Sequence, residues 1–473
     1  MDLTQLAERT RALNDRPLRP NADYVLYWAQ MNRRTSHNHA LAHAIHLANQ
    51  QGLPLLIYEA LTCTYTQAND RLHTFILEGV PDTAAGAKAL GAGYIFHLRR
   101  KKSDPNDAFY RLAKSAACIV TDDYPTFIAR QHNARVPQKL DVPYDVVDSS
   151  CVVPMSKMEK REYAAYTIRP KINRILGQYL QPFVMPKLKH AWPAKPNHPL
   201  HVEVAAGNIP ELVASCEIDH TVKPSLTFRG GSAQAEKHLR HFLQSNLKRY
   251  ATDRNQPAAH ATSGLSPYLH FGHLSSLEVA LRARDYALQQ ELVADEFIEE
   301  LVVRRELAFN FARFSDDPES LANLPEWARA TLAKHAGDPR QPAYTYEEFE
   351  QARTHDPLWN AAQQELLLRG KIHGYYRMYW GKKIIEWSPT PADAMRTMID
   401  LHDRYALDGR DPNTYTGILW CFGLHDRPWT ERAIFGMIRW MSYDGMRRKT
   451  NSEGYLKEVE LMRQTGSDPF RLQ

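Results

Sequence analysis

Five short apolar runs recur through the first third of the chain, each long enough for one β-strand and separated from the next by a stretch with helical character. The runs are YVLYW (24–28), PLLIY (54–58), GYIFHL (93–98), ACIVT (117–121) and YDVVD (144–148). Polar residues, glycine or proline bound every run, which is typical of strands that alternate with helices in a parallel sheet. The sequence therefore predicts a doubly wound, parallel α/β domain over residues 1–182.

The rest of the chain has a different pattern. Residues 183–232 are rich in proline and only lightly patterned, which is typical of a long inter-domain linker. From residue 233 to residue 473, helical periodicity dominates and strand signals nearly vanish. A chain of 473 residues is long enough for more than one hydrophobic core. We therefore expect an all-α second domain over 233–473, joined to the first through the linker 183–232.

Composition excludes several classes of protein. No run approaches the about 18 uncharged apolar residues that a membrane span needs, and the amino terminus lacks the apolar centre of a secretory signal. The five cysteines are scattered and form no Cys-x-x-Cys pair, so neither a disulfide framework nor a zinc site is predicted. The net charge of +5 fits a polyanionic partner without requiring one. We expect a cytoplasmic protein without a membrane partner.

Three histidines, His39, His43 and His46, fall on one face of a predicted helix. Imidazoles at this spacing can bind a metal, but no carboxylate partner and no His-Glu-x-x-His pattern accompanies them. The sequence therefore predicts no metal site.

Two tryptophans, Trp380 and Trp387, lie seven residues apart in the basic and aromatic segment KIHGYYRMYWGKKIIEW (371–387). Helical spacing places them on one face, about 10 Å apart along the axis. Trp359 lies on what should be the preceding helix. Core packing is the commoner role of an aromatic stripe, and an electron path is the alternative.

Hydroxyl groups and exposed backbone gather where the segment ATSGLSPYLHFGHLSSLEVA (261–280) begins. Thr262, Ser263 and Gly264 precede a helical stretch opened by Ser266 and Pro267. The arrangement suits a phosphate or pyrophosphate at a helix amino terminus, and it suits an ordinary capped helix as well.

Acidic residues and arginines alternate through residues 400–429, a segment that the sequence predicts to be rich in loops. The spacing of Asp403, Asp408, Asp411 and Asp426 does not fit a calcium loop. One hypothesis is a pocket floor of paired carboxylates and arginines that leaves Asn413 and Trp420 free to face a ligand, and the other is a salt-bridged surface loop.

Taken together, these segments resemble the class II cyclobutane pyrimidine dimer photolyases over nearly the whole chain. The motifs that carry the resemblance, in order, are LSPYLHFG, EELVVRREL, THDPLWNAAQ, GKIHGYYRMYWGKKIIEW, DRYALDGRDPN, HDRPW and MRRKT. The resemblance implies an amino-terminal α/β antenna domain, a helical domain that binds flavin adenine dinucleotide (FAD), and light-driven splitting of thymine dimers. The implied partner is UV-damaged DNA, with the dimer flipped out of the duplex. We expect a monomer, nucleoid-associated in a prokaryote.

The resemblance also implies roles for residues around the flavin. Arg377 is expected at the isoalloxazine edge, and a salt bridge between Arg254 and Asp426 is expected over the cofactor. Trp380, Trp359 and Trp387 match, from the flavin outward, the chain that photoreduces it. The positions that match the family's flavin-binding residues are Tyr250, Arg254, Thr262, Ser263, Gly264, Leu265, Ser266, Arg377, His402, Asp408, Gly409, Arg410, Asn413 and Asp426.

For the lesion, the resemblance implies that Glu300 hydrogen-bonds the dimer, Met378 lies against it and Trp420 stacks on it. Together with Arg377 and His402, these residues form the expected catalytic set. The residues expected to hold DNA are Arg304, Trp420, Arg447, Arg448 and Lys449.

Several positions depart from the family pattern. His402 stands where the family has asparagine near flavin N5, and a histidine can titrate near neutrality. Phe309 replaces an acidic residue, and WCFGLHDRPW is one residue short. His39 and Met155 stand where relatives tend to carry tryptophan, which counts against a second, antenna chromophore such as a deazaflavin or a folate.

Two alternative functions stay open. One is a cryptochrome-like flavin photoreceptor without repair activity; such receptors commonly carry a long tail, whereas this chain stops about twenty residues after MRRKT. The other is a (6-4) photoproduct photolyase, because His402 and His425 could supply the proton chemistry that this lesion needs.

Overall fold

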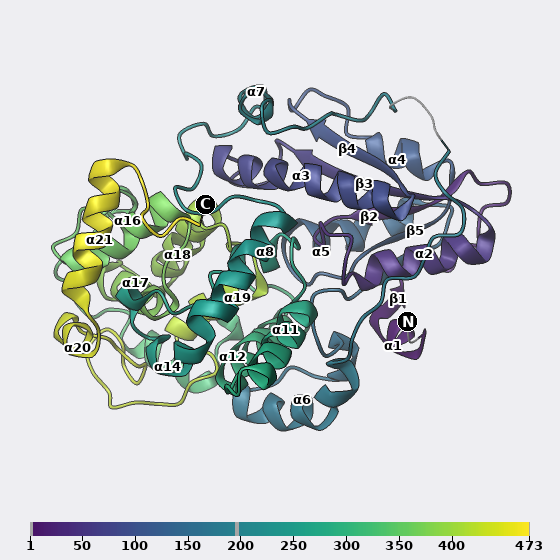
Figure 1. The fold of residues 1–473 in the computed structure, drawn as a ribbon. Coiled ribbons are helices and arrows are strands. Elements are labelled where there is room, and N and C mark those ends of the chain that lie inside the picture. The colour runs from purple at the N-terminus through teal and green to yellow at the C-terminus, as the bar shows by residue number, and fades with distance from the viewer. Residues whose placement is uncertain (1–2, 194–197, 473) are drawn as a thin grey trace.

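A computed structural model describes residues 3–193 and 198–472. Figure 1 shows a twisted sheet with helices packed on it and, beside the sheet, a larger assembly made of helices alone. The sheet comes from the first third of the chain, as predicted. The domain boundaries at 182 and 232 stay a prediction.

All five predicted strands are confirmed, as β2 (Tyr24–Ala29), β3 (Leu55–Thr62), β4 (Gly93–Arg99), β5 (Ala116–Asp122) and β6 (Tyr144–Val147). They are mutually parallel in the order β6-β5-β2-β3-β4. A short strand that the sequence did not reveal, β1 (Thr10–Ala12), pairs antiparallel with β6 at the sheet edge. Its three residues are too few to show a strand period.

Helices cover both faces of the sheet, as expected of a doubly wound domain. Val25 and Tyr27 pack with α2 (His39–Gln51), whereas Leu26 and Trp28 pack on the other face with α4 (Ala108–Ala113). Successive strand residues point to opposite faces, so two apolar layers require an uninterrupted apolar run. The remaining helices of this part are α1 (Leu3–Arg9), α3 (Asp70–Leu90), α5 (Phe127–Arg135) and α6 (Ala165–Tyr179).

The second part is helical, as predicted. Its helices are α8 (Ser232–His241), α9 (Tyr250–Asp253), α10 (Ser266–His270), α11 (Ser276–Gln289), α12 (Asp295–Ile298), α13 (Arg305–Arg313), α14 (Glu326–Lys334), α15 (Tyr346–Glu350), α16 (Pro357–Arg369), α17 (Gly374–Trp387), α18 (Pro391–Tyr405), α19 (Pro412–Cys421), α20 (Tyr443–Lys449) and α21 (Ser452–Thr465). A π-helical segment, η6 (Glu299–Arg304), joins α12 to α13.

The prediction of a loop-rich segment over 400–429 is wrong in its middle. α18 continues to Tyr405, and α19 occupies Pro412–Cys421. Asp411 starts α19, because its side chain accepts the Asn413 N–H and Pro412 follows at the first helical position. The density of acidic residues and arginines hid this helix.

Residues of the expected linker pack against the sheet domain. The Trp192 N–H donates to the Gly91 carbonyl at 2.8 Å, and the Val202 N–H donates to the Phe96 carbonyl at 2.8 Å. The segment also contains one short helix, α7 (Ile209–Ala214). Residues 194–197 of the expected linker lie outside the described residues. Proline content marked an extended path, and the described parts of that path are fixed to the domain surface.

Buried polar contacts join the two parts. Arg71 of α3 donates to the carbonyls of Leu366, at 3.0 Å, and Tyr405, at 2.7 Å, near the carboxyl ends of α16 and α18. Tyr124, just after β5, donates its hydroxyl proton to Asp411 at 2.7 Å. Because Asp411 starts α19, the sheet domain helps to set where that helix begins.

The histidines of α2 have structural partners. His43 Nε2 lies 2.9 Å from the Asp145 carboxylate of β6, so the expectation that no carboxylate accompanies these histidines is wrong. His39 is buried against Phe183. Within 3–193 and 198–472, no cluster of three or more His, Cys, Asp or Glu side chains is arranged to hold a metal ion.

None of the helices in the described ranges is at once long and apolar enough to cross a membrane. The cytoplasmic location stays a prediction.

We predict that Gly272→Ala destabilises the protein and that Gly177→Ala does not. Gly272 has φ +69°, and a Cβ there would lie 2.0 Å from the Met31 carbonyl oxygen, between the two parts of the molecule. Strain of this kind should cost more than about 2 kcal/mol. Gly177 is exposed on α6 with open space around it, so alanine should stabilise by up to about 1 kcal/mol. Melting temperatures of the two variants check this, and equal melting temperatures would contradict it.

Candidate functional site

A cleft opens in the helical part between α17 and α19. Its inner end lies between Trp380 and His402, and its outer end lies between Glu300 and Trp420. The outer cavity has a volume of about 560 Å³, within the usual range of ligand pockets, and the inner cavity adds about 140 Å³. The residues that line both ends are Gly374, Met378, Asn413, Gly417 and Trp420. The two cavities therefore adjoin each other at these five residues, and together they are called the cleft.

A buried carboxylate anchors the inner end of the cleft. Asp408 accepts two hydrogen bonds from Arg377, both at 3.0 Å, and one from the Ser266 hydroxyl at 2.7 Å. The Lys371 ammonium lies 3.2 Å from the same carboxylate. Burial raises the pKa of Asp408, but Arg377, Lys371 and Ser266 outweigh it and hold the pKa well below its ordinary value. The group therefore stays charged and fixes the orientation of the Arg377 guanidinium.

His402 presents a neutral imidazole to the inner end. Its Nδ1–H donates to the Met398 carbonyl at 3.3 Å, so Nε2 carries the lone pair. Burial, reinforced by Arg377, lowers the pKa of His402 to about 3. The expectation that this histidine titrates near neutrality is therefore wrong, because its side chain is cut off from water.

Unpaired polar atoms converge on the cleft. Within the described part of the chain, five buried atoms that belong to its lining have no hydrogen-bond partner, namely His402 Nε2, Arg377 Nε, His373 Nε2, His425 Nε2 and Thr416 Oγ1. Buried polar atoms are normally paired, so a cluster of unpaired ones indicates room for a polar ligand. A ligand with both hydrogen-bond donors and acceptors fits these atoms.

The three tryptophans form a continuous series of ring contacts that leads away from the cleft and is called the tryptophan stack below, although Trp359 meets Trp387 edge to face. The rings of Trp380 and Trp359 are parallel, with centroids 6.4 Å apart, and Trp359 lies 6.1 Å from Trp387. The Trp359 indole N–H donates to the Trp380 carbonyl at 3.0 Å, and Gln363 accepts the Trp380 indole N–H at 2.9 Å. Spatial order thus follows the predicted order, with Trp380 on the cleft wall.

Charged groups line the outer end of the cleft. Glu300 of η6 accepts a hydrogen bond from Arg254 at 2.5 Å, and Arg304 lies on the same wall. Trp420 is 37% exposed at the carboxyl end of α19. An exposed indole opposite a carboxylate suits a flat ligand with donors on its edge.

The expected salt bridge between Arg254 and Asp426 is wrong. Arg254 pairs with Glu300 and, at 3.5 Å, with Glu296, because α9 packs beside α12, which continues into η6. Asp426 instead accepts the N–H of Arg427 at 2.8 Å. Both carboxylate partners of Arg254 lie about forty residues along the chain, at positions that no local pattern links to it.

Five further positions expected at the flavin lie outside the lining of the two cavities. Arg410 has φ +64°, and its side chain donates to the Thr66 carbonyl at 3.0 Å, so it lines a second pocket beside the sheet. Gly409 packs against the His402 carbonyl, which a Cβ would meet at 2.7 Å. Of the hydroxyl-rich turn, Thr262 lines the cleft and Ser266 bonds Asp408, whereas Ser263, Gly264 and Leu265 do not reach the lining. Tyr250, Arg254 and Asn413 do line it.

The predicted basic cluster lies outside the cleft. Arg447, Arg448 and Lys449 are exposed at the end of α20, where the two arginines border a separate, shallow hollow.

Some residues in or next to the cleft were not predicted from the sequence. Lys371 belongs to the same motif as Arg377, and a lysine in such a segment was a signal for an anion partner. His373 and Arg439 line the outer end, but Arg439 lies in a segment without a regular pattern, and nothing local marks it.

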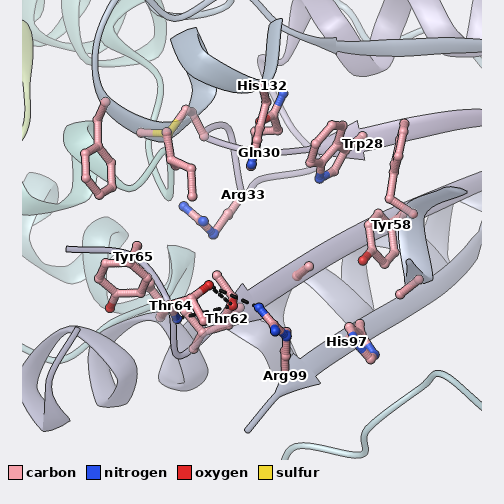
Figure 2. A pocket seen from close by; sticks show the side chains of 18 of the residues that line it. Trp28, Gln30, Arg33, Tyr58, Thr62, Thr64, Tyr65, His97, Arg99 and His132 are labelled. Carbon is pink, nitrogen blue, oxygen red and sulfur yellow. Dashed lines mark hydrogen bonds between the residues drawn. The ribbon is translucent and has the colours of Figure 1, made fainter. Parts of the chain in front are cut away.

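A second pocket, of about 270 Å³, lies at the carboxyl ends of the parallel strands. Figure 2 shows Trp28 and Tyr58 on one side of it, and Arg33 and Arg99 pointing into the same space. Ligands bind preferentially at this edge of parallel sheets. Neither His39 nor Met155 belongs to the lining of this pocket. His39 packs against Phe183, and Met155 lies in the core cluster that contains Phe309.

Phe309 packs between the two parts of the molecule. Its ring lies 5.5 Å from Tyr124, and it shares a core cluster with Met155. The departure at this position therefore affects inter-domain packing and leaves the cleft lining unchanged.

Comparisons with known proteins agree with this architecture. Residues 25–190 match the family model described as DNA photolyase. A deoxyribodipyrimidine photo-lyase of Methanothermobacter thermautotrophicus is 40% identical, over 96% of this chain and 98% of that protein. A deoxyribodipyrimidine photo-lyase of Oryza sativa is 38% identical, over 92% of this chain and 87% of that protein. Among solved structures, a Synechocystis cryptochrome superposes with a TM-score of 0.70 at 15% identity, covering 94% of this chain and 90% of that one. A class III photolyase of Agrobacterium tumefaciens superposes with a TM-score of 0.69 at 16% identity, covering 96% of this chain and 91% of that one.

The sheet, the helical assembly and its cleft thus define the fold class of photolyases and cryptochromes. The relatives are 36–40% identical over nearly the whole chain. The chain therefore belongs to the DNA photolyase family.

We predict that Asp408→Asn destabilises the protein at neutral pH by about 3 to 5 kcal/mol, because it leaves Arg377 and Lys371 without their counter-charge. The pKa of Asp408 is lowered on folding, so the carboxylate stabilises the fold above its ordinary pKa of about 4, and this contribution fades as the pH falls below that value. Chemical denaturation of both proteins at pH 7 and pH 3.5 checks this. Asp285→Asn, at an exposed ion pair, is the control and should change little. A difference that grows on acidification would contradict the prediction.

Proposed function

We propose that this protein is a class II photolyase that splits cyclobutane pyrimidine dimers in DNA with light, acting as a monomer. The observation that carries the proposal is the stack of three tryptophans that ends on the wall of a cleft with unpaired polar atoms. Relatives from an archaeon, two plants and a marsupial, at 36–40% identity, are named deoxyribodipyrimidine photo-lyase. The order of the seven motifs supports class II.

The cleft fits the cofactor that this proposal requires. FAD, which the photolyase and cryptochrome family binds, supplies light-driven one-electron chemistry when bound. Arg377, oriented by Asp408, would hold an acceptor on the ring edge. His402 Nε2 would accept a hydrogen bond from an N–H of the flavin ring. The imidazole's own proton is on Nδ1, which donates to the Met398 carbonyl. Thr262 and Tyr250 would hold the rest of the molecule.

The outer end of the cleft suits a flipped pair of pyrimidines. Trp420 offers an exposed face for stacking, Met378 an adaptable apolar contact, and Glu300 an acceptor for base N–H groups. Arg304 and Arg439 at the mouth can hold flanking phosphates, and the exposed cluster Arg447, Arg448 and Lys449 can hold the backbone farther away.

The protonation states favour cyclobutane dimers over the (6-4) photoproduct. That alternative relied on His402 and His425 as proton donors. Burial lowers the pKa of His425 to about 4, and that of His402 to about 3, so both are neutral at physiological pH. His425 donates its Nδ1–H to the Tyr163 carbonyl, which leaves it no second proton to give to a lesion.

The second pocket supports an antenna chromophore. Its aromatic walls and the guanidinium of Arg99 suit a flat, anionic chromophore such as a deazaflavin or a folate, whereas Arg33 is already paired with the buried Glu59 at 3.1 Å. The positions that counted against this cofactor, His39 and Met155, lie outside the lining. An absorption band of the purified protein, separate from that of the flavin, would reveal it.

The decisive assay separates the three candidate functions. Photoreduced protein is incubated under blue light with oligonucleotides that carry either a cyclobutane dimer or a (6-4) photoproduct. We expect loss of the cyclobutane dimer alone. Loss of the (6-4) lesion alone would assign the other repair activity, and loss of neither would favour a photoreceptor.

We predict that Trp380→Phe abolishes flavin photoreduction, because phenylalanine is too hard to oxidise to carry an electron through the stack. Chemically reduced variant should still repair the dimer. Trp192→Phe, in the segment packed on the sheet, is the control and should photoreduce normally. Absorbance changes under illumination measure flavin photoreduction in the two variants. Normal photoreduction in Trp380→Phe would contradict the proposed electron path.

A further inference from the structure

The tryptophan stack does not end at the surface. Trp387, its outermost member, is only 3% exposed, and its ring is enclosed by Trp359, Phe349, Tyr344 and His355. A buried tryptophan that has lost an electron has poor access to a reductant in solution. A donor placed between Trp387 and the solvent would relay electrons to it.

A tyrosine lies directly beyond it. The ring of Tyr344 meets the ring of Trp387 edge to face, with centroids 5.5 Å apart. This spacing is shorter than either step within the tryptophan stack, which measure 6.4 and 6.1 Å. The Tyr344 N–H donates to the Trp387 carbonyl at 3.1 Å, so the backbone fixes the two rings together. Tyr344 is partly exposed.

A base lies against the phenol. The backbone N–H of His355 donates to the Tyr344 hydroxyl oxygen at 2.9 Å, which leaves the hydroxyl proton free to be donated elsewhere. Nδ1 of His355 lies 2.7 Å from that oxygen. In the tautomer that carries the ring proton on Nε2, Nδ1 of His355 accepts the hydroxyl proton of Tyr344. His355 is exposed, so a proton taken at Nδ1 can be released to water from Nε2.

We propose that Tyr344 and His355 form the outer end of the electron path: Tyr344 gives an electron to oxidised Trp387, and its phenolic proton moves to Nδ1 of His355. The products are a neutral tyrosyl radical and an imidazolium. Tyr344 would thus replace the electron that the tryptophans give to a bound flavin, and an external thiol would restore Tyr344 by giving one electron, with a proton returning from solvent. Because the tyrosyl radical is neutral and the proton has left, return of the electron is slow. The inference rests on the proposed function, since it requires the tryptophans to supply a flavin.

The flavin-loaded full-length protein provides the test. After a light pulse, electron paramagnetic resonance and transient absorption identify the radical. We expect a tyrosyl radical in the unmodified protein, and a shorter-lived tryptophan radical in Tyr344→Phe. The yield of photoreduction with an external thiol should fall several-fold in that variant. Tyr346→Phe is the matched control, because Tyr346 lies two residues away and donates its hydroxyl to Glu350.

The role of His355 has its own readout. His355→Gln keeps a hydrogen-bond acceptor but removes the base, so oxidation of Tyr344 should slow several-fold although the ring contact with Trp387 remains. In the unmodified protein the same step should slow in deuterium oxide. A merely structural role of His355 predicts no solvent isotope effect.

Two results would overturn the proposal, namely a long-lived radical on tryptophan in the unmodified protein, or a tyrosyl signal that persists in Tyr344→Phe. Its failure is distinguishable from failure of the proposed function. A protein that repairs dimers but forms no tyrosyl radical loses only this inference. One that forms the Tyr344 radical but leaves both lesions intact supports the inference and loses the repair proposal.

Discussion

The geometry of the cleft depends on the hydrogen bonds and ion pairs of the buried Asp408 carboxylate. This carboxylate joins three segments, because its partners come from the start of α10, from the turn before α17 and from α17 itself. An unpaired buried carboxylate would be strongly destabilising. The fold therefore depends on the partners of Asp408, namely Ser266, Lys371 and Arg377, and only the fold brings these three residues to it. This arrangement sets the direction of Arg377 and, through the helix that carries it, the wall formed by Trp380. Geometry at the inner end is therefore fixed before any ligand binds.

The two ends of the cleft differ in chemistry because they differ in access to water. At the inner end, burial keeps His402 neutral and leaves its Nε2 without a partner among the described residues. At the outer end, Trp420 and the pair of Arg254 with Glu300 are partly exposed, which suits a large ligand that enters and leaves. The proposed electron path leads away from the cleft through the protein core to Tyr344, which is partly exposed, and His355, which is exposed.

Much of the fold was predictable because local periodicity carries it. The five apolar strands follow from uninterrupted apolar runs, and α17 follows from helical spacing. The spacing of Trp380 and Trp387 indicated one face, the resemblance implied Trp359 between them, and the three rings lie in that order. α19 was missed, although Asp411 and Pro412 are a regular helix start, because the acidic residues around them also fit a loop.

The sequence by itself determined the sheet, the helical second part and the family, since each rests on the order and period of neighbouring residues. Only the tertiary structure decided which charges meet and which face water. Arg254 pairs with Glu300 and not with Asp426, and Arg410 turns to the pocket beside the sheet while Asp408 stays in the cleft. The physical reason is that pairing, burial and the resulting pKa shifts depend on segments far apart in the chain, which periodicity does not relate.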